Sequence, residues 1–148
     1  MKEFVDIEIS GTHLRYDESD PIAVNISGNH YIDSGIHKIT YVEEAQGFDE
    51  IILNTIIVQK NRVEIIKEGV VNSKMVFANN SRFKVVYNTP FGRLDMETET
   101  KLLLIDMNED EINVYVEYIL YIEGDRASNS KMRIHIVEAV DSVDKRGG

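Results

Sequence analysis

Hydrophobic and charged residues alternate along most of this chain, and the longest alternating stretch lies between residues 93 and 104. Every second residue there is apolar or carries a small hydroxyl group: Leu94, Met96, Thr98, Thr100, Leu102 and Leu104. The residues between them are charged: Arg93, Asp95, Glu97, Glu99 and Lys101. A period of two is typical of a β-strand with one buried and one solvated face. The pattern therefore predicts a long strand whose even-numbered residues face the core.

The same alternation predicts strands in most of the remaining chain, over residues 3–10, 22–32, 36–44, 49–60, 63–68, 71–78, 83–87, 112–122 and 132–136. Short turn signals separate them, among them Ser34-Gly35, Asn79-Asn80 and Gly124-Asp125. Such residues accept the backbone conformations that tight hairpins need. No amphipathic helix pattern precedes residue 138.

Several of these strands are longer than the usual length of about five or six residues. Tight turns between consecutive long strands favour an antiparallel meander. A meander of roughly eight to ten strands leaves no exposed edge when it closes into a barrel. We therefore predict an all-β fold, a single antiparallel meander β-barrel over residues 1–137. The tail 138–148 is expected to be a short helical turn or disordered. A two-layer sandwich with Greek-key crossings is the alternative architecture.

Composition narrows the possible partners and compartments. The formal net charge is −10, and the basic residues are scattered, which argues against nucleic-acid binding. The sequence has no cysteine, which excludes disulfides and zinc-thiolate sites. No apolar run approaches the roughly 18 residues of a spanning helix, so no membrane association is expected. Asp6 and Glu8 interrupt the region where a secretory signal would be apolar, and a cytoplasmic location is expected.

The spacing of several motifs resembles the YwiB-like family: Tyr41–Glu44, Lys67–Gly69, Phe77 and Tyr87–Leu94, the last followed by Thr98 and Thr100. The resemblance covers residues 22–137 and is continuous from 69 to 102. It implies a calycin-like, lipocalin-related β-barrel in small bacterial proteins of unknown function. This chain departs from the pattern at two positions, with lysine at 67 where an arginine is expected and asparagine at 54 where a threonine is expected. The resemblance implies no catalytic residue and no cofactor.

Polar side chains in phase with the inward face form the candidate ligand-binding set: Tyr41, Glu43, Asn54, Lys67, Thr98, Thr100 and Tyr118. An unpaired charge inside a barrel costs several kcal/mol. Lys67 and Glu43 are therefore expected to pair, or a ligand carboxylate to replace Glu43. Alternatively, both charges lie at strand ends and reach solvent, and the threonines serve only as strand formers. We predict a non-catalytic barrel that binds a small amphipathic or apolar ligand.

A second set of residues lies opposite the predicted core: Tyr115, Ile119 and Tyr121, accompanied by Ile51, Leu53 and Ile57. Apolar surface outside a barrel indicates a partner, or cover from another segment of the chain. The alternative function is therefore a packed barrel that acts as an interaction or structural module, as a homodimer or with a protein partner.

Signals for metal sites and catalysis are weak. Residues 106–117 match a calcium loop in part, but Glu111 stands where the loop needs glycine, which favours a hairpin turn. His30 and His37 lie in paired strands and could share a face as metal or haem ligands. Structural, hydrogen-bonded histidines are favoured because no zinc-ligand spacing is present. Neither a nucleophile motif nor a phosphate-binding glycine loop occurs. We therefore predict no catalytic residue, metal or cofactor.

Overall fold

A computed structural model describes residues 1–12, 22–44 and 50–139, and over these residues the chain forms strands and no helix. The strands are β1 (Phe4–Thr12), β2 (Ile22–Asp33), β3 (Ile36–Glu44), β4 (Ile51–Val58), β5 (Val63–Gly69), β6 (Ser73–Phe77), β7 (Arg82–Thr89), β8 (Gly92–Met107), β9 (Glu111–Ile122) and β10 (Asp125–Glu138). The part of the chain that is described contains no helix able to cross a bilayer.

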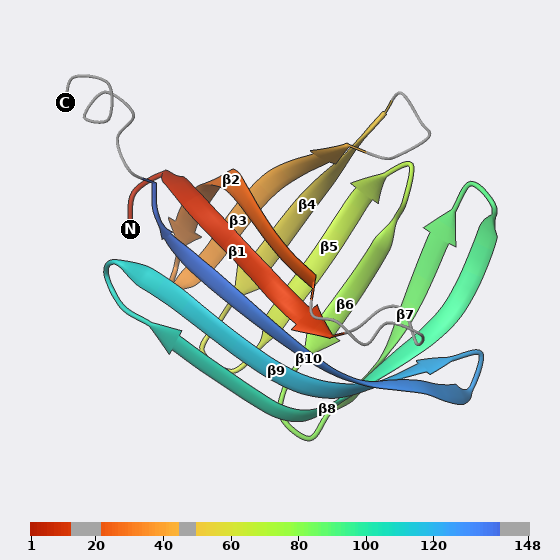
Figure 1. The fold of residues 1–148 in the computed structure, drawn as a ribbon. Coiled ribbons are helices and arrows are strands. Elements are labelled where there is room, and N and C mark those ends of the chain that lie inside the picture. Colours follow the sequence, from red (N-terminus) through yellow and green to blue (C-terminus); the bar gives the residue numbers. More distant parts are fainter. Residues whose placement is uncertain (13–21, 45–49, 140–148) are drawn as a thin grey trace.

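The strands form one sheet in the order β6-β5-β4-β3-β2-β1-β10-β9-β8-β7, and every neighbouring pair is antiparallel. The first and last strands pair with each other, and the sheet curls into a nearly closed barrel (Figure 1). Its two end strands, β6 and β7, meet through one isolated bridge between Asn72 and Asn88. The predicted all-β meander barrel is confirmed, and the alternative sandwich is wrong.

One hairpin turns at the predicted Ser34-Gly35, and another turns at Glu123-Gly124, one residue before the predicted Gly124-Asp125. Ser34 and Gly35 have φ angles of 52° and 81°, and Glu123 and Gly124 have φ angles of 49° and 85°. Two consecutive positive φ angles match the twist of the strands on either side. Because β10 begins directly after Gly124, the last strand is longer than the predicted 132–136.

The stretch that resembled a calcium loop is a hairpin turn between β8 and β9. The Oδ1 atom of Asn108 accepts hydrogen bonds from the backbone N–H groups of Asp110 and Glu111, at 2.8 and 3.0 Å. The backbone N–H of Asn108 donates to the carbonyl of Glu111 at 3.0 Å. Asn108 therefore closes the turn itself, as is usual for this residue type.

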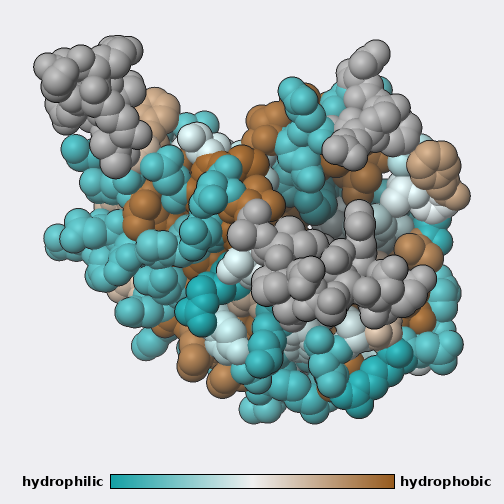
Figure 2. Space-filling model, viewed as in Figure 1, coloured by the Kyte–Doolittle hydropathy of each residue, from teal (hydrophilic) through white to brown (hydrophobic). Residues whose placement is uncertain are grey.

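The middle of the barrel is filled by side chains. Phe77 on β6 and Tyr118 on β9 meet inside with ring centroids 4.9 Å apart, although six strands separate β6 from β9 in the order of the sheet. Aliphatic residues that are almost completely buried surround them: Val5, Ile7, Ile39, Ile56, Val58, Val63, Val114, Val116, Ile134 and Ile136. The face of the molecule in Figure 2 is largely hydrophilic, with hydrophobic residues exposed in places.

The longest strand changes phase in its middle, contrary to the pattern read from the sequence. Thr100 pairs with Tyr118, but the next pair joins Leu102 to Glu117, so Lys101 forms a β-bulge. An extra residue turns the following side chains to the opposite face. Leu103 consequently lies in the core, whereas Leu104 is 55% exposed on the outside. The prediction that residues 102 and 104 face inward is therefore wrong.

The described chain ends next to its beginning. β10 continues to Glu138, one residue beyond the predicted boundary at 137. The backbone N–H of Ala139 then donates to the carbonyl of Phe4 at 2.9 Å. The rest of the predicted tail lies outside the described residues.

Candidate functional site

A polar cluster faces the interior at one end of the barrel. β3, β5 and β7 all finish at this end, which we call the Glu43 end and which lies to the right in Figure 1. Tyr41 pairs with Asn54, Glu43 with Ile52, and Asn54 with Lys67 across β3, β4 and β5. Side chains directly opposite each other in a sheet share a face. The register therefore places all four polar residues on the inner wall.

The cluster is joined by short hydrogen bonds. Lys67 Nζ lies 2.8 Å from Glu43 Oε1 and donates to Asn54 Oδ1 at 2.9 Å. Asn54 Nδ2 donates to Glu43 Oε1 at 2.9 Å. Asn54 is fully buried, whereas the side chains of Lys67 and Glu43 are 27% and 39% exposed. The predicted pairing of Lys67 with Glu43 is confirmed, and the pair reaches solvent as the alternative expected.

This arrangement keeps Glu43 ionised. Burial by itself would raise the pKa of its carboxyl group, but hydrogen bonds from Lys67 and Asn54 outweigh that effect and lower the pKa from its ordinary value of 4.5. One lysine N–H and the Oε2 atom of Glu43 are not used inside the cluster. The cluster can therefore offer both a donor and an acceptor to a molecule at this end.

Two tyrosines stand near the cluster, of which sequence reasoning identified one. Burial, and then the Glu43 carboxylate, raise the pKa of Tyr41 to about 12. The same two causes raise the pKa of Tyr87 on β7. The phase of Tyr87 with Val85 indicates an inward side chain, but only the closed barrel brings it towards β3.

The interior is less filled at the Glu43 end than in the middle. Val24 pairs with Ile9, and Leu94 with Tyr87, so both side chains are on the inner face by register. They are nevertheless 42% and 41% exposed. Further apolar residues of the inner face are only partly buried: Ile9, Ile26, Met75, Met96 and Ile122. Inward apolar surface that remains accessible can receive an apolar group.

Three other candidate residues lie in the packed middle of the barrel. Thr98 is fully buried and donates from Oγ1 to the carbonyl of Val76 at 3.3 Å. Thr100 is also fully buried, and its Oγ1 has no hydrogen-bond partner in the described structure. Burial raises the pKa of Tyr118 to about 12, partly offset by a hydrogen bond with Ser130. The structure therefore separates these three residues from the Glu43 cluster.

The residues expected to form an outer interface are mostly covered. Ile119 is only 7% exposed. The guanidinium groups of Arg133 and Arg82 lie over the rings of Tyr115 and Tyr121, 5.0 and 4.0 Å from the ring centroids. Stacked arginines cover the faces that an aromatic anchor would present to a partner. None of these three residues is fully exposed, and the predicted interface stays a prediction.

A histidine pair occupies the opposite end of the barrel. His30 Nε2 and His37 Nδ1 lie 2.8 Å apart, with ring centroids separated by 5.0 Å. His30 is 4% exposed, and its backbone N–H donates to the carbonyl of Glu3. Within the described residues, no three metal-ligating side chains converge. The predicted shared face is present, and the pair is hydrogen-bonded.

We expect this pair to make stability fall on mild acidification. Burial lowers the pKa of both imidazoles below 6.5, and the neighbouring His37 lowers that of His30 further. The unfolded chain therefore binds protons first, so stability is full above about pH 6.5 and decreases as the pH falls towards the folded pKa values. Urea unfolding at about pH 7.5 and about pH 5.5 measures the difference in the free energy of unfolding between the two pH values. This difference should be smaller in His37→Gln than in the wild-type protein, but not in His135→Gln. An equal difference in both variants would contradict the assignment.

Comparisons with known proteins identify a family and a fold. The family model described as "Domain of unknown function (DUF1934)" matches residues 7–134. The crystal structure of the YwiB protein from Bacillus subtilis is similar, with a TM-score of 0.75 and 17% sequence identity. The similarity covers 93% of this chain and 91% of that one. No curated protein matches the chain significantly.

Proposed function

This chain belongs to the family described as a domain of unknown function (DUF1934), and from that premise we propose that it is a non-catalytic binding protein for a small amphipathic ligand. The observation that carries the proposal is the Glu43–Asn54–Lys67 cluster on the inner wall. It lies at the end where inward apolar side chains keep solvent exposure. The absence of cysteine is compatible with a reducing compartment. We therefore propose a cytoplasmic location.

The proposed ligand has a polar head and an apolar body. Its head would contact Lys67 and Glu43, which together offer one cation and one carboxylate. Its body would contact apolar side chains of the inner face, such as Val24 and Met96. The ligand cannot extend past the contact between Phe77 and Tyr118, because the middle of the barrel is filled. The site therefore suits a short ligand. Native mass spectrometry of protein purified from its own host tests whether such a molecule copurifies.

We expect Lys67→Met to weaken the binding of dansylglycine, a short carboxylate whose dansyl rings form an apolar body, by roughly tenfold. The substitution removes the cation and keeps the length of the side chain. The fold should remain intact, because Glu43 keeps the Asn54 hydrogen bond and contact with solvent. Fluorescence titration gives the affinity, and Lys101→Met, on the outer wall, is the control. Equal affinities of the wild-type protein and Lys67→Met would contradict the proposed head-group site.

A second candidate function is association through the outer wall of β3 and β4. Val42 and Leu53 are opposite each other in register and are 52% and 39% exposed, beside Ile51 at 58%. Such a patch suits a second copy of this chain, because an isologous interface needs only one self-complementary surface.

Under this second proposal, Leu53→Glu should convert a dimer into a monomer, because a carboxylate cannot be buried unpaired in an apolar interface. Light scattering coupled to size exclusion measures the mass. Tyr121→Glu tests the face expected from the sequence, and it should leave the dimer intact because Arg82 covers that ring. A wild-type protein that is monomeric at all concentrations would remove this candidate.

A further inference from the structure

The hairpin of β6 and β7 is joined at both ends and open in its middle. Asn72 and Asn88 exchange two backbone hydrogen bonds of 3.0 and 2.9 Å, and Ser81 N–H donates to the carbonyl of Ala78 at 3.1 Å. Continuing the register of this bridge would pair Lys74 with Val86 and Val76 with Lys84. No ladder hydrogen bond joins these pairs in the described structure. We call this gap, between residues 72–76 and 84–88, the open seam.

Contacts to β8 hold the open seam apart. The side chain of Asn79 pairs with the backbone of Leu103, accepting from its N–H at 2.7 Å and donating to its carbonyl at 3.1 Å. The backbone N–H of Thr100 donates to the carbonyl of Ser81 at 2.9 Å. Thr98 Oγ1 donates to the carbonyl of Val76, on the edge of the seam. These bonds draw the turn at 78–81 towards β8, so the opening is part of the fold.

The open seam carries unpaired backbone groups. N–H and C=O groups point to the same side of a strand at every second residue. The bonds of Asn72 and Asn88 therefore direct the backbone groups of Lys74, Val76 and Val86 into the seam. Of these groups, the Val76 carbonyl has the Thr98 hydroxyl as its partner. The remaining groups can bind a polar ligand that enters the seam.

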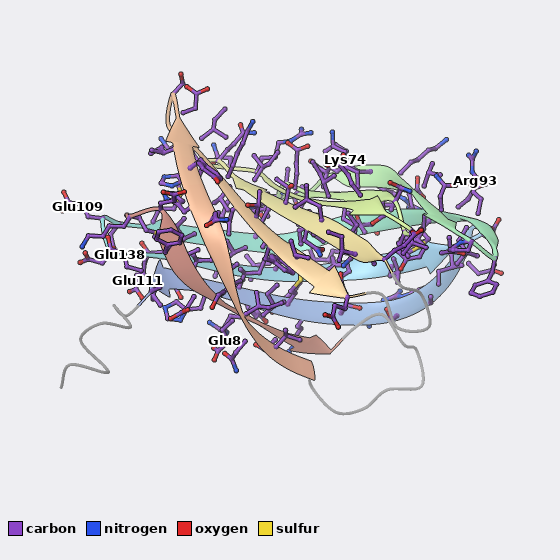
Figure 3. The ribbon with its side chains drawn as sticks, turned by 90° about the horizontal axis from the view of Figure 1, so that it is seen from above. Glu8, Lys74, Arg93, Glu109, Glu111 and Glu138 are labelled. Carbon is purple, nitrogen blue, oxygen red and sulfur yellow. The ribbon has the colours of Figure 1, made fainter. Side chains whose placement is uncertain are left out.

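A groove of about 630 Å³ lies over the open seam. This volume is within the range of small-molecule sites, about 300–1,000 Å³. Its cationic lining residues are Arg62, Lys67, Lys74 and Lys84. The apolar side chains of Ile66, Val76, Phe83 and Val86 also line it, with Glu68 as the acidic residue. Lys74 stands on the outer side of the wall (Figure 3). A protein of net charge −10 thus concentrates cations at this groove.

The basic side chains that line the groove differ in whether they already form an ion pair with a carboxylate of the protein. Glu64, whose side chain is 11% exposed, lies 3.0 Å from Lys74 and 3.4 Å from Arg62. Lys67 is paired with Glu43. Lys84 has no ion pair within the described part of the chain. An incoming anion would therefore contact Lys84 and share Lys74 with Glu64.

We propose that the open seam binds a small organic dianion with an apolar body, of the class of aromatic phosphate monoesters. Lysines and backbone N–H groups together suit a phosphate, and the apolar side chains suit a ring. The seam is closed at both ends by the Asn72–Asn88 bridge and by the 78–81 turn, which favours a small molecule over a polymer. This site differs from the head-group site proposed above in its other lining residues, although Lys67 belongs to both.

Naphthyl phosphate is the ligand that tests the proposal. Inorganic phosphate carries the charge without the ring, and naphthalenemethanol carries the ring without the charge. Amide chemical shifts should change at Lys74, Val76 and Val86 when naphthyl phosphate is added, and each simpler probe should bind more weakly. Lys84→Gln should weaken binding roughly tenfold at low salt. Glu64→Gln should strengthen it, because Arg62 and Lys74 lose their competing carboxylate.

Lys131→Gln is the matched control, because it removes the same charge from an exposed position on β10. An equal loss of affinity in Lys131→Gln and Lys84→Gln would overturn the proposal, as would shift changes confined to Tyr41 and Glu43. Tighter binding of a hexaglutamate peptide than of naphthyl phosphate would overturn the small-molecule assignment. Dansylglycine should bind Lys84→Gln normally, so a failure of one site is distinguishable from a failure of the other.

Discussion

Phe77→Ala should destabilise the protein by about 3–5 kcal/mol, the usual cost of removing a buried aromatic ring from a packed core. Phe77 is fully buried and contacts Tyr118 across the barrel, with ring planes inclined at 56°. Urea unfolding monitored by circular dichroism measures the loss. Phe4→Ala, at a position that is 65% exposed, should change stability by less than about 1 kcal/mol.

This experiment distinguishes a packed barrel from a hollow one. A ring that lined an empty cavity would lose few contacts on truncation, so a loss below about 1 kcal/mol would show that the middle of the barrel is open. If Phe77→Ala does not fold, Phe77→Leu keeps most of the volume and should cost about 1–1.5 kcal/mol. A loss in Phe77→Leu as small as that in Phe4→Ala would likewise contradict close packing.

Asn54→Leu should cost about 2–3 kcal/mol, because it removes two hydrogen bonds to charged partners from a fully buried position. Leucine has nearly the same shape as asparagine, so the loss reports the polar contacts. Urea unfolding measures the change, and Asn25→Leu, at an exposed position on β2, should alter stability by less than about 0.5 kcal/mol.

Asn54→Leu also has an expected titration signature. In the wild-type protein the pKa of Glu43 lies below 4.5, so its contribution to stability is present above about pH 4.5 and is lost as the pH falls through the folded pKa. The variant loses one of the hydrogen bonds that lower this pKa, so the Glu43 pKa should rise and the acid loss of stability should diminish. An unchanged carboxyl titration, followed by NMR, would show that Asn54 does not hold the carboxylate.

The relation between sequence and site differs from residue to residue. Glu43 and Lys67 could be predicted as partners because a period of two places them on the same face of β3 and β5, the two strands that flank β4. Tyr87 could not be linked to them, since β7 is distant from β3 in the sheet order and approaches it only through closure. The alternation correctly predicts that the side chains of Thr98 and Tyr118 point into the barrel. It does not predict how far along the barrel axis each side chain lies.

The open seam shows the same limit. The alternation of β6 and β7 and the turn between them predict an ordinary hairpin. The hairpin opens because Asn79 and Ser81 bond to β8, which is a contact between segments that are distant in sequence. The alternation of apolar and polar residues does not predict which of two strands will bind a given backbone group. The cationic groove therefore had no recognisable signature in the chain.

By itself, the sequence determined the strands, their inner and outer faces and the all-β meander, because alternation and turn residues act through local backbone geometry. Tertiary structure decided the phase change at Lys101, where four consecutive apolar residues, 102 to 105, fit either face equally well. It also decided which part of the interior is filled and which end remains accessible. Those properties depend on side chains from opposite walls meeting across the barrel, and their distance is set only when the sheet closes.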